Sequence, residues 1–173
     1  MESLLKKEFS DSPFITEIGK GSFATVFKAI HKDHEVAIKV IELARLANKK
    51  LEWNVKSEIN ILKRLRHPNI VELFEVKAVA ECIFIVMEYC VLGDLSDYLK
   101  SQPEGRFKEP ICKILIRQLA SGLVYMQQNY HLIHRDLKPQ NLLLTKDPLR
   151  NDDGGLVLKI ADFGFVKSLD FGK

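Results

Sequence analysis

Residues 134–141 read His134-Arg135-Asp136-Leu137-Lys138-Pro139-Gln140-Asn141 and lie between two apolar runs. A plain solvated loop is one interpretation, but the side chains also combine well for chemistry. Asp136 can accept a proton from a hydroxyl group, and Lys138 can stabilise charge on a phosphoryl group during transfer. Asn141 offers a neutral oxygen ligand of the kind that hard cations prefer. The segment therefore predicts a loop that carries reacting and metal-binding groups.

Asp162-Phe163-Gly164 follows a hydrophobic run at residues 156–161 that is predicted to be a strand. That strand would hold the Asp162 carboxylate as a second ligand for the same cation, and Gly164 would allow a sharp change of chain direction. The same residue types recur at Asp170-Phe171-Gly172, but no regular strand precedes them. We interpret the second copy as coincidental and predict Asp162 as the metal ligand.

The first half of the chain reads as strands around one helix. Short β-branched or aromatic runs predict strands at residues 14–18, 24–29, 35–41, 70–74 and 83–87. Over residues 43–66 the apolar positions instead recur at helical spacing, at Leu51, Val55, Ile59, Leu62 and Leu65. Pro68 marks the end of this helix, because a residue before proline is disfavoured in helical geometry. The predicted fold class is α+β, with a five-stranded antiparallel sheet and one helix.

The glycine-bearing segment Gly19-Lys20-Gly21-Ser22 separates the first two predicted strands. Glycines let backbone N–H groups approach phosphate oxygens, which side chains would obstruct. A dinucleotide-binding Rossmann fold would need a helix immediately afterwards, whereas Thr25-Val26-Phe27 is strand-like. The segment favours a glycine-rich hairpin over a nucleotide, with an ordinary β-turn as the alternative.

Lys39 and Glu58 both stand among residues that should be buried. A lysine in a strand usually extends its charge to the surface. Glu58, however, lies three residues after Val55 and four before Leu62, on the apolar side of the predicted helix. Removing the partner of such a buried charge costs about 3–5 kcal/mol. We therefore predict a Lys39–Glu58 ion pair that holds the ammonium group where it can meet phosphates.

The second half of the chain is predicted to be mainly helical, after a connector at residues 89–94. Helices are predicted at residues 95–100 and 109–131, and a strand at 156–161 follows a loop at 145–155. The longer helix would bury a stripe made of Ile111, Leu115, Leu119, Gly122 and Met126.

Composition excludes several classes of protein. The 173 residues are 46% hydrophobic and 28% charged, which is typical of a globular protein and not of a disordered one. The formal net charge of +3 argues against a nucleic-acid or membrane-surface role. Cys82, Cys90 and Cys112 lack metal-type spacing and are expected to be reduced thiols. We expect no transmembrane segment and no signal peptide.

Together these motifs resemble the protein-kinase catalytic domain, because they occur in that family's order along almost the whole chain. The resemblance implies a kinase domain at residues 14–173, preceded by an extension at 1–13. Within the domain it implies a first lobe at 14–88, a hinge at 89–94 and part of a helical second lobe at 95–173. Lys138 in this setting is similar to serine/threonine kinases and not to tyrosine kinases.

The resemblance also implies roles for individual residues. The catalytic set would be Asp136, which orients the hydroxyl nucleophile, with Lys138, Lys39 and Glu58. The metal ligands would be Asn141 and Asp162. The ATP-binding set would be Gly19, Lys20, Gly21, Ser22, Val26, Ala37, Lys39, Met87, Glu88, Cys90, Asp94 and Leu143. Leu62, Leu73, His134 and Phe163 resemble the hydrophobic stack that links the two lobes. The implied cofactors are ATP and Mg²⁺.

Within the kinases, the segments 86–99, 138–144 and 159–165 are similar to the uncoordinated-51-like kinases that initiate autophagy. That similarity implies protein substrates, autophagy-complex subunits as partners, and a cytoplasmic location with peripheral recruitment to the autophagosome-forming membrane. Two positions depart from the family pattern: Ala24 replaces the third glycine, and Leu92 stands where glycine is common.

A complete kinase continues through an activation segment and several further helices, and we expect the present sequence to be a fragment or short isoform. The long helix is then expected to expose an apolar patch. One hypothesis is therefore an active protein kinase in a longer form. The alternative is a catalytically incompetent module that binds ATP or a partner. A third hypothesis, a kinase of small molecules or lipids, fits residues 134–139 less well.

Overall fold

The structure is a computed structural model that describes residues 2–21, 24–46, 49–147, 149 and 155–168. The chain divides into two compact units. The first comprises residues 1–59 with 72–89, and the second comprises residues 60–71 with 90–173. The first lobe was expected to include all of residues 14–88. Residues 60–71 instead belong to the second unit.

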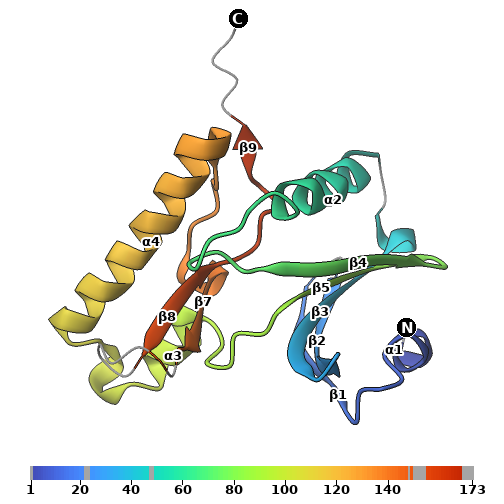
Figure 1. Cartoon of the computed structure of the whole chain (residues 1–173), viewed down its shortest axis with the longest axis horizontal. Helices are drawn as coiled ribbons and strands as arrows, with labels where there is room; N and C mark the ends of the chain where they lie inside the picture. The colour runs from blue at the N-terminus through green and yellow to red at the C-terminus, as the bar shows by residue number, and fades with distance from the viewer. Residues whose placement is uncertain (1, 22–23, 47–48, 148, 150–154, 169–173) are drawn as a thin grey trace, which may run out of the picture. The chain divides into compact units, whose positions relative to one another are not determined.

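The first unit contains the predicted five-stranded antiparallel sheet (Figure 1). Its strands are β1 (Ile15–Lys20), β2 (Ala24–His31), β3 (His34–Glu42), β4 (Leu73–Val79) and β5 (Cys82–Glu88), in the order β1-β2-β3-β5-β4. The fourth strand was predicted at residues 70–74, and that position is wrong. Ile70 forms only an isolated bridge with Ile160, and the backbone N–H of Val71 donates to the Ile160 carbonyl at 3.0 Å.

An N-terminal helix, α1 (Glu2–Glu8), covers one face of this sheet. Leu5 and Phe9 are buried at 0% and 3% exposure, in a cluster with Ile38 of β3 and Phe84 of β5. Side chains alternate between the two faces of a strand, so Lys39 points to the face opposite Ile38. The sequence patterns predicted no element here, because a seven-residue helix is too short to show helical periodicity.

The single helix predicted over residues 43–66 is two separate pieces. A 3₁₀ turn spans Leu43–Arg45, and the α-helix α2 spans Lys49–Leu62. Glu58, Ile59 and Leu62 of α2 are buried, as the predicted face requires, whereas Trp53 is exposed. Leu65 is also buried, but it lies beyond the end of the helix.

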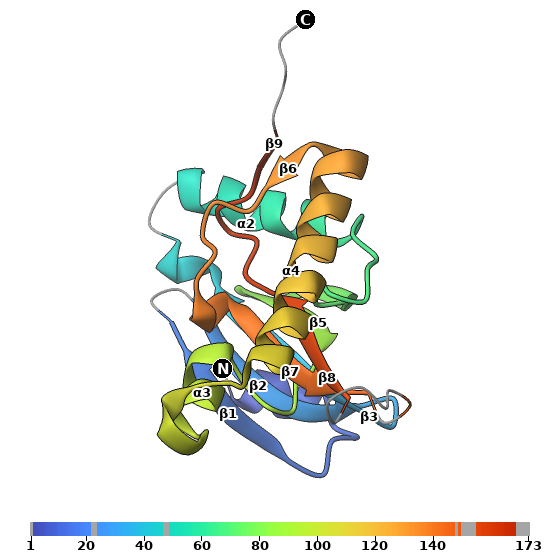
Figure 2. The same cartoon turned by 90° about the vertical axis from the view of Figure 1, so that its left-hand side faces the viewer.

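The second unit combines helices with two short antiparallel sheets. The helical pieces are α3 (Leu95–Lys100), η2 (Pro103–Gly105), α4 (Glu109–Tyr130) and η3 (Pro139–Asn141). The strands are β6 (Leu132–Ile133), β7 (Leu142–Lys146), β8 (Leu156–Ile160) and β9 (Lys167–Ser168), paired as β7–β8 and β6–β9. Figures 1 and 2 show α4 running beside the β7–β8 hairpin. The second Asp-Phe-Gly copy, at residues 170–172, lies outside the described residues.

The buried stripe of α4 differs from the predicted one. The structure buries Leu115, Gln118, Gly122 and Met126, whereas Ile111 and Leu119 are only half-buried. Gly122 permits close packing, because a Cβ there would lie 2.7 Å from Cδ1 of Ile160 and 3.2 Å from the carbonyl oxygen of Asn69. The helix therefore sits directly against β8.

Two apolar side chains of α4 lie on its outer side. Ile116 is 65% exposed and Val124 is 49% exposed. No helix among the described residues has the length and apolar character needed to cross a bilayer.

Candidate active site

The glycine-bearing segment is a β-hairpin. Gly19 pairs with Val26 and Lys20 with Thr25 across β1 and β2, and the Gly21 N–H donates to the Ala24 carbonyl at 2.8 Å. A strand and not a helix follows the glycines, which excludes the Rossmann interpretation. A Cβ on Gly21 would approach no atom closer than 3.5 Å, so internal packing does not demand glycine. Ser22 lies outside the described residues.

Lys39 of β3 and Glu58 of α2 form the predicted ion pair, with 2.7 Å between Nζ and Oε1. The Glu58 side chain is 7% exposed and that of Lys39 is 21% exposed. The strand's alternation points Lys39 away from the α1 face, and the helical stripe points Glu58 back to the sheet. The pair fixes the ammonium group on this face of the first unit.

Other predicted nucleotide-binding residues of the first unit lie on neighbouring strands. Ala37 of β3 is buried and stands opposite half-buried Met87 of β5 in the register. Val26 of β2 stands opposite Lys39. The backbone N–H of Glu88 donates to the Glu72 carbonyl at 2.9 Å. The end of β5 is therefore held in place by the chain that precedes β4.

Cys90, Asp94 and Leu143 lie in the second unit. Cys90 is buried, and its carbonyl accepts a hydrogen bond from the Gly93 N–H at 3.1 Å. The Asp94 carboxylate accepts from the Asp97 N–H at 2.9 Å and so caps α3. Asp94 also forms an isolated bridge with Leu143 of β7. These residues are close together, and Asp94 has a structural task besides any ligand contact.

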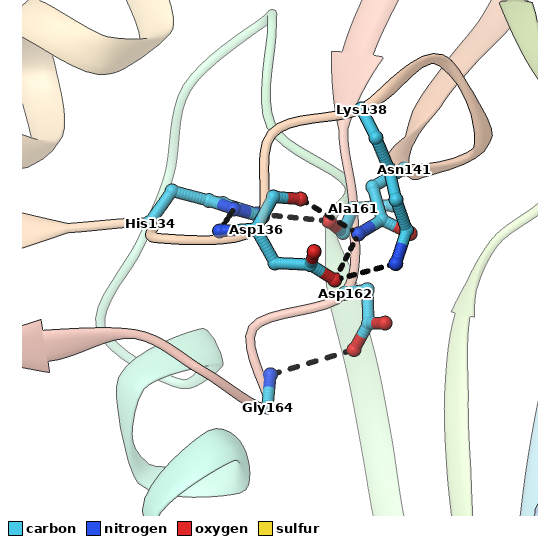
Figure 3. A network of polar contacts seen from close by, with 7 residues as sticks. All are labelled: His134, Asp136, Lys138, Asn141, Ala161, Asp162 and Gly164. Carbon is cyan, nitrogen blue, oxygen red and sulfur yellow. Dashed lines mark hydrogen bonds and ion pairs between the residues drawn. The ribbon is translucent and has the colours of Figure 1, made fainter.

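Asp136 is the centre of a polar network in the 134–141 loop (Figure 3). Its Oδ2 accepts from Nζ of Lys138 at 2.8 Å and from Nδ2 of Asn141 at 2.9 Å. Asn141 also donates to the Asp136 backbone carbonyl at 2.8 Å. The loop therefore holds the Asp136 carboxylate in one orientation with neighbouring donors, and it is not a freely solvated segment.

The network also sets the protonation of these groups. Chiefly through its hydrogen bond, Lys138 lowers the pKa of Asp136, and Asn141 adds to this effect. The hydrogen bond to Asp136 raises the pKa of Lys138, and the nearby charge of Asp162 contributes in the same direction. Both groups are therefore kept charged at neutral pH, with Asp136 as an acceptor.

His134 joins this loop to the end of β8. Its Nε2 lies 3.0 Å from the Ala161 carbonyl oxygen, and its ring packs edge-on against buried Phe163 with 5.4 Å between centroids. Burial lowers the pKa of His134, although the Ala161 hydrogen bond opposes this shift. The neutral ring therefore donates from Nε2 to Ala161, the residue immediately before Asp162.

Asp162 and Arg135 adopt left-handed backbone angles, with φ of 61° and 67° respectively. Such angles are unfavourable for residues other than glycine and persist where the surroundings hold them. Arg135 Nε donates to the Phe165 carbonyl at 2.7 Å. The Gly164 N–H points to Oδ1 of Asp162 at 3.4 Å. The turn at Asp162 is thus anchored on both sides.

The donor set fits a hard divalent cation of the magnesium type. The Asn141 amide nitrogen is engaged by Asp136, so the amide oxygen is the donor that this side chain could offer. Asp162 adds an exposed carboxylate. No group of three or more His, Cys, Asp or Glu side chains in the described chain could hold a metal. Magnesium typically binds through one or two protein oxygens together with substrate phosphates and water.

The predicted site residues thus form two sets. Lys39, Glu58 and the glycine hairpin belong to the first unit. Asp136, Lys138, Asn141 and Asp162 belong to the second. The first three are joined by hydrogen bonds, and Asp162 follows Ala161, whose N–H donates to the Asn141 carbonyl. Two buried polar residues, Asn69 and Gln118, escaped sequence analysis although they contact β8. Gln118 follows Leu115 by three residues and precedes Gly122 by four, so the sequence places it on the buried stripe of α4. The same spacing within an apolar stripe identified Glu58 as a buried polar residue.

Comparisons with known proteins agree with this geometry. The protein kinase domain family matches residues 13–173. The chain is 40% identical over 90% of its length to a Neosartorya fischeri protein named serine/threonine-protein kinase atg1, and covers 21% of that protein. It is 46% and 48% identical over 88% of its length to the Arabidopsis thaliana serine/threonine-protein kinases ATG1b and ATG1c, and covers 20% of each. The chain therefore spans about a fifth of these relatives.

Proposed function

The chain belongs to the protein kinase domain family, and we propose that it supplies the catalytic groups of an ATP-dependent protein serine/threonine kinase. The observation that carries this proposal is the Asp136–Lys138–Asn141 network beside the anchored turn at Asp162. It unites a proton acceptor, a cation and oxygen donors for a metal, which phosphoryl transfer requires. The relatives named above support the serine/threonine class.

The proposed roles follow from what each group can do. Asp136, held ionised by Lys138, accepts a hydrogen bond from a substrate hydroxyl and orients its oxygen for attack on the γ-phosphoryl group. Lys138 stabilises negative charge on that group, and Lys39 holds the α- and β-phosphates. Asn141 and Asp162 would hold Mg²⁺, which neutralises phosphate charge when bound.

The nucleotide-binding surface is proposed to comprise the glycine hairpin, Ala37, Met87, Glu88, Cys90, Asp94 and Leu143. The glycines carry no side chain that would obstruct phosphate oxygens, and the side chain of Ala37 is small enough for a base to approach. The lobe and hinge assignments at residues 14–88, 89–94 and 95–173 belong to the same proposal. We also propose a role in autophagy initiation, with cytoplasmic protein substrates and partners, from the resemblance of residues 86–99 and 138–144.

A second candidate is a kinase-related module that binds ATP or a partner without phosphotransfer. Ile116 and Val124 are exposed apolar side chains of α4 that a partner of such a module could contact. The two candidates make different predictions for the 173-residue chain.

The deciding experiment measures both binding and transfer with the chain of residues 1–173. Mg-ATP is added in a thermal unfolding assay, and radiolabelled γ-phosphate is followed into a serine/threonine peptide mixture. A kinase shows a rise in Tm and transfer that Asp136→Asn abolishes. A binding module shows the rise in Tm without transfer. Absence of any rise in Tm would overturn nucleotide binding for both candidates.

A further inference from the structure

Strand β8 has β7 on one edge. On its other edge, its backbone groups form hydrogen bonds with Asn69, Val71 and the side chain of Gln118. Gln118 Nε2 donates to the Leu156 carbonyl at 2.9 Å, and its Oε1 accepts from the Leu158 N–H at 2.6 Å. The side-chain amide thus makes the two contacts that a neighbouring peptide group would make in a sheet.

Asn69 continues the same pairing toward Asp162. Its Nδ2 donates to the Leu158 carbonyl at 2.9 Å, and its backbone carbonyl accepts from the Ile160 N–H at 2.9 Å. The Val71 N–H then donates to the Ile160 carbonyl at 3.0 Å. Asn69 and Gln118 also contact each other, with 3.2 Å between Nδ2 and Oε1. The carbonyl groups of Leu156, Leu158 and Ile160 and the N–H groups of Leu158 and Ile160 along this edge are therefore all hydrogen-bonded.

The two side chains are well placed to fix the register of β8. Both are buried, at 6% and 7% exposure, so water does not compete for these hydrogen bonds. A strand that slips by one residue turns every side chain to the other face of its sheet. Because Gln118 pairs with the alternate residues Leu156 and Leu158, a one-residue slip of β8 would break both of its hydrogen bonds, and Gln118 therefore selects the observed register over the slipped one. Gly122, one turn later on α4, brings the helix close enough for this contact.

We propose that Gln118, assisted by Asn69, is a positioning residue for Asp162. β8 ends at Ile160, and the Ala161 N–H donates to the Asn141 carbonyl at 2.9 Å. The register that Gln118 selects therefore decides where Asp162 lies relative to Asn141. This inference rests on the proposed function, in which those two residues hold the metal, and it identifies a buried amide on α4 as a determinant of metal affinity.

The test compares Mg²⁺ dependence among variants of the 173-residue chain. Gln118→Met keeps the side-chain volume but removes both hydrogen bonds. Gln128→Met makes the same change at an exposed site of α4, and Leu115→Ala removes a buried apolar side chain of the same helix without removing a hydrogen bond to β8. Binding of a fluorescent ATP analogue is titrated with Mg²⁺ at a temperature where circular dichroism shows each variant folded. Hydrogen exchange of the Leu158 amide is followed in parallel.

We expect Gln118→Met to need about tenfold more Mg²⁺, as when a partner that orients a metal ligand is lost. Nucleotide binding at saturating Mg²⁺ should stay near the wild-type value, and exchange at Leu158 should accelerate. Gln128→Met and Leu115→Ala should keep the wild-type Mg²⁺ midpoint. If Gln118→Met is unfolded, Asn69→Ala replaces it with the same expectations.

Other outcomes overturn the proposal. A wild-type midpoint in the Gln118→Met chain would show that β8 keeps its position without the amide. If Leu115→Ala raises the Mg²⁺ midpoint as much as Gln118→Met does, the cause is a general loss of stability and not the loss of the two hydrogen bonds. A wild-type chain without Mg²⁺-dependent nucleotide binding would overturn the proposed function together with this inference, whereas failure of the variant alone leaves the proposed function standing.

Discussion

Nζ of Lys39 lies 2.7 Å from Oε1 of Glu58, and the pair joins the third strand of the sheet to the helix across its face. The carboxylate is almost fully buried, whereas the ammonium group retains some access to water. Burial of this kind makes each partner depend on the other, because an unpaired charge in a low-dielectric site is costly. The pair therefore connects β3 to α2, and its lysine is also the proposed phosphate contact.

Removing only the lysine should destabilise the first unit. Lys39→Met leaves Glu58 buried without a partner and should lower the free energy of unfolding by about 3 kcal/mol, the lower end for a broken buried pair. The double variant Lys39→Met/Glu58→Leu should recover most of that loss, since neither charge of this pair remains. Urea unfolding measures both values. Equal destabilisation of the single and double variants would contradict the pairing argument.

The same variants separate stability from ligand binding. The double variant should remain folded but show a smaller rise in Tm with Mg-ATP than the wild type, because the phosphate contact is gone. An unchanged rise would mean that Lys39 does not contact the nucleotide.

Lys138 should control the ionisation of Asp136. Lys138→Met removes the main cause of the lowered pKa, so the pKa of Asp136 should rise. Asn141 still donates to the carboxylate, so part of the lowering should persist. Carbon-13 NMR titration of the Asp136 carboxyl group measures the change, and Lys138→Arg serves as the control that keeps the charge. If the pKa of Asp136 is the same in Lys138→Met as in the wild type, the hydrogen bond from Lys138 is not the cause of the lowered pKa.

His67 should make stability depend on pH. Burial, with the charge of Lys159, lowers its pKa below the ordinary value of 6.5. Its Nδ1 accepts from the Asn69 N–H at 3.0 Å, a bond that only the unprotonated nitrogen can accept. The native state therefore binds fewer protons than the unfolded state. The stabilisation is complete above about pH 6.5 and is lost as the pH falls below that value, through the lower pKa of the folded state.

This pH dependence can be measured as Tm from about pH 8 to about pH 5. The Tm of His67→Gln should fall less on acidification than the Tm of the wild type. The Tm of His34→Gln, which changes an exposed site, should fall as much as that of the wild type. Part of the dependence should remain in His67→Gln, because burial also lowers the pKa of His134. Parallel curves for the wild type and His67→Gln would refute the assignment.

Gly122→Ala should be destabilising although alanine is the better helix former. Helix propensity favours alanine by about 1 kcal/mol, but overpacking typically costs about 1–3 kcal/mol. Here the new methyl group would meet Ile160 and the immovable carbonyl of Asn69. We expect a net loss of about 1 kcal/mol in the free energy of unfolding. In the background of Ile160→Val, which removes the nearer atom, Gly122→Ala should cost less. Equal costs in both backgrounds would show that Ile160 is not the obstacle.

The N-terminal helix should be an integral part of the first unit. Phe9, the residue directly after α1, packs edge-on against Phe84 at 6.1 Å between centroids and is 3% exposed. Phe9→Ala should therefore lower the free energy of unfolding by about 3–5 kcal/mol. Lys6→Ala, at an exposed site of the same helix, should change it by less than about 0.5 kcal/mol. A small effect of Phe9→Ala would mean that residues 1–13 are only an appendage.

Much of the architecture was readable because it depends on local patterns. Alternation of apolar residues identified the strands, helical spacing placed Glu58 on the buried face, and the helix at residues 95–100 has its predicted bounds. The prediction for residues 70–74 failed because Ile70 and Val71 pair with Ile160, far away in the sequence. Helix α1 was not predicted, because its apolar side chains are buried only by contact with the sheet, which is formed by later parts of the sequence.

The sequence by itself determined the reacting groups and their order, because motif spacing fixes which residue types lie within a few positions of one another. It also determined the Lys39–Glu58 pair, since a charge within an apolar stripe demands a partner. Only the tertiary structure decided what holds these groups in place. Gln118 and Gly122 of α4 meet Asn69, which lies about fifty residues earlier in the chain, at β8 through side-chain hydrogen bonds and close packing. Such contacts depend on distances in space, which neither composition nor periodicity records.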